Sequence, residues 1–61
     1  MNAEEFEVAL EEAREGIVSH DNRASLPLHE ALMRIAQSPA VMHDRLVLEA
    51  RMIRERELAN P

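Results

Sequence analysis

The sequence predicts an all-α fold, a short antiparallel bundle of two to three helices. Hydrophobic residues make up 46% of the 61-residue chain, yet only one residue is aromatic. The chain has one Gly and three Pro, and its apolar residues are mostly Leu, Ile, Val, Met and Ala, which is typical of helices rather than sheets. In three separate stretches the apolar residues recur every three or four positions, which is the period of an amphipathic helix.

The first helix is expected at about residues 3–19. Asn2 is a favoured N-cap residue, and Glu5 follows three residues later, as in a capping box. Gly16 should weaken the last turn, and the turn-like residues 19–23 should end the helix. One face, roughly 120° wide, carries the apolar residues of this stretch: Ala3, Phe6, Ala9, Leu10, Ala13 and Ile17.

The second helix is expected at about residues 26–37. Ser25 is the predicted N-cap, and Pro27 is tolerated in the first turn because N–H groups there have no partner within the helix. The predicted apolar face consists of Leu28, Ala31, Leu32, Ile35 and Ala36.

The third helix is expected at about residues 39–58, after a break at Pro39. Proline has no N–H and disfavours helical geometry in the residue before it. Ser38 followed by Pro39 also has the pattern of an N-cap with proline at the first helical position. The alternative is one continuous helix that is bent at Pro39.

The third helix has two apolar stripes, about 120° apart by helical geometry. The first stripe is formed by Met42, Leu46, Ala50 and Ile53, and the second by Val41, Leu48 and Met52. A helix in a monomeric bundle needs only one buried face, so two stripes indicate two neighbours. We therefore predict a homodimer, in which the interface of each copy consists of Val41, Leu48, Met52 and the adjacent Arg45.

The length of the chain also favours self-association. Sixty-one residues form one domain at most, here residues 1–61, and a chain this short has marginal stability on its own. It contains no cysteine that could form a disulfide. We expect a whole small gene product in the cytoplasm, because the first residues lack a signal-peptide profile and no apolar run reaches the length of a membrane span.

Nothing in the sequence indicates an enzyme, a cofactor or a metal site. His20, His29 and His43 form no pair at the close spacing that zinc sites show. No Glu-x-x-His motif occurs, so a di-metal bundle is not expected. The serines lie at predicted helix ends, where capping explains them.

The first helix carries a strongly acidic side, with six Glu and one Arg between Glu4 and Glu15. One interpretation is a solvated surface that keeps the protein soluble. The other is a docking face for a basic partner, such as a host protein that itself binds nucleic acid. Glu4, Val8, Glu11 and Glu15 are the candidate docking residues, with Val8 as an apolar anchor among the carboxylates.

These features predict a non-enzymatic protein–protein interaction module. We expect a small acidic regulator or inhibitor, of the type found in phages and mobile elements, that blocks a host protein. One alternative is a helix-turn-helix regulator that reads DNA through His43, Arg45 and Arg51. Asp44 and Glu49 on the same helix and the net charge of -5 make nucleic-acid binding an unfavoured function. A second alternative is a structural subunit of a larger assembly.

Overall fold

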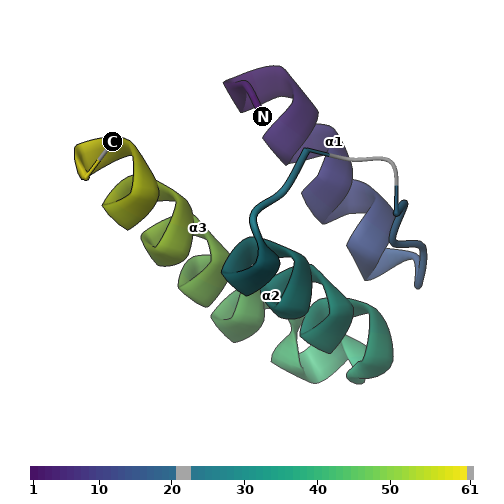
Figure 1. The fold of residues 1–61 in the computed structure, drawn as a ribbon. Coiled ribbons are helices and arrows are strands. Elements are labelled where there is room, and N and C mark those ends of the chain that lie inside the picture. Colours follow the sequence, from purple (N-terminus) through teal and green to yellow (C-terminus); the bar gives the residue numbers. More distant parts are fainter. Residues whose placement is uncertain (21–22, 61) are drawn as a thin grey trace.

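The structure is a computed structural model that describes residues 1–20 and 23–60. Within these ranges it contains three α-helices and no strand, as the sequence predicts (Figure 1). The helices are α1 (Ala3–Arg14), α2 (Leu26–Gln37) and α3 (His43–Ala59), and the 3-10 turn η1 (Ala40–Met42) leads directly into α3. The observed bounds of α2 are those predicted.

α1 begins with the predicted capping box. The Glu5 N–H donates to the Asn2 side chain at 2.8 Å, and the Asn2 N–H donates to the Glu5 carboxylate at 2.9 Å. Two backbone donors at the start of the helix are thereby satisfied. The buried face of α1 is formed by Phe6, Ala9, Leu10 and Ala13.

α1 ends earlier than predicted, and the extension to residue 19 is wrong. Gly16 adopts a left-handed conformation with φ of +86°. Its N–H donates to the Ala13 carbonyl and the Ile17 N–H donates to the Glu12 carbonyl, both at 2.9 Å. This Schellman arrangement terminates the helix, and Ile17 lies exposed rather than in the core. Asp21 and Asn22 of the predicted turn lie outside the described residues.

α2 supplies the centre of the core. The Ser25 hydroxyl accepts a hydrogen bond from the Leu28 N–H at 3.4 Å, so Ser25 is the N-cap as predicted. Leu32 and Ile35 are the largest fully buried side chains. Burial of each such side chain stabilises the fold by about 1.5–3 kcal/mol.

The chain breaks between α2 and α3, so the continuous bent helix is excluded. Ser38 and Pro39 are both extended, with ψ of 153° and 155°. The predicted role of Ser38 as N-cap of the third helix is wrong. Its hydroxyl instead donates to the Arg34 carbonyl at 2.6 Å and so satisfies the end of α2. Helical geometry resumes at Ala40, one residue later than expected.

α3 runs antiparallel to the other two helices. Glu7 near the start of α1 pairs with Arg51 in the second half of α3, and Arg14 at the end of α1 pairs with Asp44 at the start of α3. The two helices therefore run in opposite directions. Against α2, the Ser25 hydroxyl donates to the Glu57 carboxylate at the end of α3. α1 and α2 therefore run in the same general direction (Figure 1).

The buried side of α3 differs from the predicted stripe. Its buried residues are His43, Val47 and Ala50, whereas the predicted stripe contained neither His43 nor Val47. His43 can be buried because its Nε2 atom lies 3.0 Å from the Ser38 carbonyl oxygen, which gives the ring a polar partner. Of the predicted stripe, Ala50 is buried, Leu46 and Ile53 are half-buried, and Met42 is exposed.

Candidate interaction surfaces

The first candidate surface, called here the acidic face, consists of Glu4, Val8, Glu11 and Glu15. All four residues are exposed, on the side of α1 opposite its buried residues. Residues 1–15 contain six Glu and one Arg, so their charge of -5 equals that of the whole chain. The remaining residues contain six acidic residues and six Arg, which cancel. The net charge of the molecule is therefore concentrated on one helix.

The acidic face contains a shallow hollow around Val8, which is 57% exposed. The hollow has a volume of about 380 Å³. Its apolar lining comes from Met1, Val8 and Ala9, and its carboxylates from Glu4, Glu5 and Glu12. An apolar floor beside several carboxylates matches the side chain of Arg or Lys, which has an apolar stem and a cationic head.

Glu7 lies outside the acidic face and is paired with α3. Arg51 of α3 donates two hydrogen bonds to its carboxylate, one of them at 3.1 Å between Nη2 and Oε1. The hydrogen bonding by Arg51 lowers the pKa of Glu7, and the positive charges of Arg51 and Arg54 act in the same direction. Arg54 also lies over the Phe6 ring, with its Cζ atom 5.1 Å from the centroid. Glu7 and these arginines thus connect α1 to α3.

The second candidate surface lies on the outer side of α3. The four residues predicted for self-association, Val41, Arg45, Leu48 and Met52, are all exposed. The exposed fractions of Val41, Leu48 and Met52 are 87%, 58% and 52%, so three large apolar side chains face solvent on one side of one helix. Because the buried residues of α3 lie on the opposite side, this surface is accessible along its length.

Two residues that were not predicted continue this surface toward the end of α3. Glu55 and Ala59 are exposed and follow Met52 at spacings of three and four residues. The signal that identifies them is the alternation of four and three residues from Val41 to Ala59, which is the spacing of a coiled-coil seam. We call these six residues the α3 seam: Val41, Arg45, Leu48, Met52, Glu55 and Ala59.

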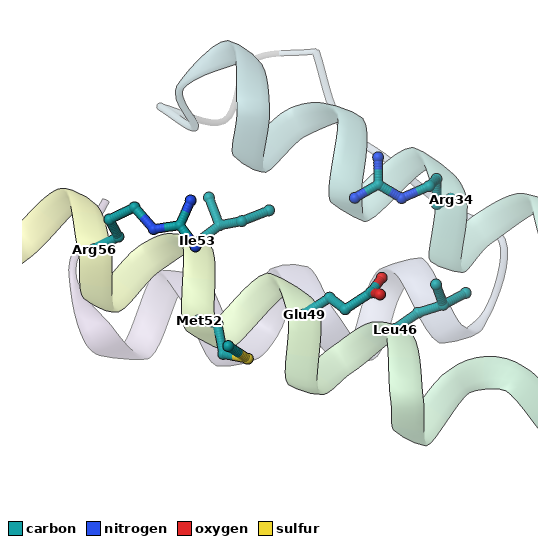
Figure 2. A pocket seen from close by; sticks show the side chains of 6 residues that line it. All are labelled: Arg34, Leu46, Glu49, Met52, Ile53 and Arg56. Atoms are coloured by element: carbon teal, nitrogen blue, oxygen red, sulfur yellow. The ribbon is translucent and has the colours of Figure 1, made fainter.

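A groove of about 520 Å³ borders the seam between α2 and α3. Figure 2 shows that Leu46 and Ile53 point toward α2, whereas Met52 lies on the side of α3 turned away from it. Charged side chains from both helices line the groove: Arg34, Glu49 and Arg56. The sequence did not indicate this groove, because it depends on how α2 crosses α3.

The histidines and the residues proposed for reading DNA are not gathered in one place. His43 is buried, Arg51 is paired with Glu7, and Arg45 remains exposed. The rings of His20 and His29 lie 5.6 Å apart between centroids. Among the described residues no group of three or more His, Cys, Asp or Glu side chains is suitably placed to hold a metal ion.

None of the helices in the described part of the chain has the length and apolar character needed to cross a membrane. The chain matches no protein-family model, no curated protein sequence and no solved structure. The geometry of the two surfaces is therefore the basis for the functional proposal.

Proposed function

We propose that this chain is a cytoplasmic, non-enzymatic protein-interaction module whose acidic face docks a basic surface of another protein. The observation that carries the proposal is the concentration of the whole net charge in residues 1–15, around an exposed hollow with an apolar floor. Such a field accelerates the encounter with a basic partner, and the hollow around Val8 offers a contact for one side chain of that partner. A partner held in this way would be blocked sterically, as by a small regulator or inhibitor.

The helix-turn-helix alternative receives less support from the geometry. Reading helices of that motif follow a first helix at about 90–120°, whereas α3 returns antiparallel along α2. His43 contributes to the core and Arg51 neutralises Glu7, so neither is free to contact a base or a phosphate. A basic protein surface is therefore a better proposed target than a nucleic acid.

Affinity capture from the native host, with variants of the acidic face as bait, tests this function. We expect Glu4→Gln/Glu11→Gln to reduce the recovery of the partner strongly, and the addition of Glu15→Gln to reduce it further. The loss should resemble that caused by raising the salt concentration, because both weaken long-range attraction.

The matched control is Glu30→Gln/Glu49→Gln, which removes two exposed acidic groups from α2 and α3 and changes the net charge by the same amount. It should leave capture unchanged. Equal capture by both double variants, with circular dichroism showing that both are folded, would refute docking through the acidic face and leave solubility as its role.

We further propose that the module is a homodimer that associates through Val41, Arg45, Leu48 and Met52. Size-exclusion chromatography with light scattering should give about twice the mass of 7.0 kDa. Leu48→Glu should yield a monomer, because it places a charge within the apolar contact. Val8→Glu, a similar change on the acidic face, should leave the mass unchanged. A wild-type mass of one chain at tens of micromolar would refute the dimer.

A further inference from the structure

We infer that the α3 seam pairs with the seam of a second copy in antiparallel orientation, so that Arg45 faces the partner's Glu55. The two-fold axis passes between Leu48 and Met52, at the level of residue 50. This inference rests on the self-association proposed above and adds the orientation and the register of the two helices.

The spacing of the seam supports a helix–helix contact. Its residues alternate at intervals of four and three along 19 residues of η1 and α3, from Val41 to Ala59. This alternation keeps one narrow line of side chains toward a partner helix. All six residues are exposed, on the side opposite the buried His43 and Ala50. Most of the seam therefore faces solvent, while Met52 borders the groove against α2 and Glu55 borders a small pocket against α1.

The order of side chains along the seam selects the antiparallel orientation. With the axis between Leu48 and Met52, Leu48 lies against the partner's Met52, and Arg45 lies against the partner's Glu55. At the ends, the larger Val41 meets the partner's small Ala59. Each apolar residue faces an apolar residue and each charge faces its opposite, so the seam is self-complementary, as an isologous contact requires.

Other arrangements of the same seam lack this complementarity. In a parallel pair, Arg45 would face the partner's Arg45, and Glu55 would face the partner's Glu55. Such contacts between like charges are unfavourable. Sliding the antiparallel pair by one heptad, which is two layers, places Arg45 against the partner's Leu48. A charged layer within an otherwise apolar contact lowers affinity but fixes the register, which is the role that we assign to Arg45 and Glu55.

Arg45 and Glu55 are also available for such a contact. Among the described residues the ion pairs are Arg14 with Asp44 and Glu7 with Arg51, and neither pair includes them. Arg54 is likewise engaged, because its guanidinium lies over the Phe6 ring. Arg51 and Arg54 are therefore used in contacts with α1, whereas Glu55, which lines a small pocket beside them, and Arg45 form no ion pair among the described residues.

Disulfide trapping tests the orientation, and the absence of cysteine from the chain makes single-cysteine variants unambiguous. Val41 and Ala59 lie about 27 Å apart along a helix that rises about 1.5 Å per residue. In the proposed dimer, Val41→Cys alone cannot form a disulfide with its own copy, because bonded cysteines have Cα atoms within about 7 Å. A mixture of Val41→Cys and Ala59→Cys should form the mixed disulfide under mild oxidation.

Charge exchange tests the register. Arg45→Glu should weaken dimerisation by about tenfold or more, because two unfavourable layers arise in each dimer. Glu55→Arg should have a similar effect. The double variant Arg45→Glu/Glu55→Arg should return to within roughly threefold of wild type, because each charge again faces its opposite. Glu30→Arg, an exposed reversal on α2, is the control and should not change dimerisation.

The outcomes separate this inference from the proposal on which it rests. A wild-type chain that is monomeric by light scattering refutes both. A dimer that traps Val41→Cys with its own copy is parallel, and it refutes only the orientation. A dimer that forms no mixed disulfide, or that the double charge exchange fails to restore, uses another register or another surface and also refutes the inference.

Discussion

Replacement of Gly16 by alanine tests how α1 ends. Gly16 has a φ of +86°, and a Cβ atom added there would meet no other atom within 4 Å. The cost therefore comes from the backbone alone, about 1–2 kcal/mol for an L-residue in the left-handed region. Alanine also restricts the unfolded chain, which offsets about 0.4–1 kcal/mol of this cost. We expect Gly16→Ala to lower the free energy of unfolding by about 1 kcal/mol.

Urea denaturation followed by circular dichroism measures this change. With a slope of about 1 kcal/mol per molar urea for a small protein, the midpoint should fall by about 1 M. Protein concentration must be held constant, because the stability of a dimer depends on it. Gly16→Asn should lose less, since asparagine tolerates the left-handed region better than alanine. An unchanged or higher midpoint for Gly16→Ala would refute the left-handed ending and favour a helix that continues past residue 16.

Two further predictions concern contacts between elements. Ser38→Ala should lower stability by about 0.5–1.5 kcal/mol by urea denaturation, because it removes the hydrogen bond to the Arg34 carbonyl; a larger loss would indicate that Ser38 caps α3 after all. The pKa of Glu7 is lowered from 4.5 by Arg51, so the ion pair stabilises the fold above the ordinary pKa of Glu, and this contribution is lost as the pH falls through the lowered value. At about pH 7, Glu7→Gln should therefore melt at a slightly lower temperature than wild type, by a small margin because the pair is exposed. In acid, below the lowered pKa of Glu7, the two melting temperatures should converge, and an undiminished difference there would contradict this origin.

Much of the fold could be predicted from local sequence signals. Asn2 with Glu5 indicated the start of α1, Ser25 indicated the start of α2, and Pro39 indicated the break. These signals work because capping and proline geometry involve neighbouring residues only. Gly16 was read as a weak point in a helix, whereas its positive φ makes it the end; apolar periodicity continued to Ile17 and concealed the stop.

The missed features depend on contacts between distant residues. His43 is polar and was not predicted as part of the buried stripe, but the break at Ser38 places a carbonyl oxygen where the ring can reach it. Val47 lies one turn after His43 and is therefore buried on the same side of α3. The buried side thus differs from the predicted stripe by a rotation about the helix axis. The helical spacing of the sequence was sufficient to predict that the acidic face and the first four seam residues are exposed. The groove beside the seam could not be predicted in this way, because it depends on how α2 crosses α3.

The start of α1 and the end of α3 lie at the same end of the bundle (Figure 1). Met1 and Leu58 line one small pocket there, together with Ser25 and Leu28 at the start of α2. A short linker could join these ends, and the chain could be reopened between α1 and α2, as in circular permutants of other domains. Because α1 packs mainly against α2, the permuted order α2, α3, α1 would place these packing partners at opposite ends of the sequence. A higher contact order slows folding, so such a permutant should fold more slowly than the natural order while keeping both interaction surfaces.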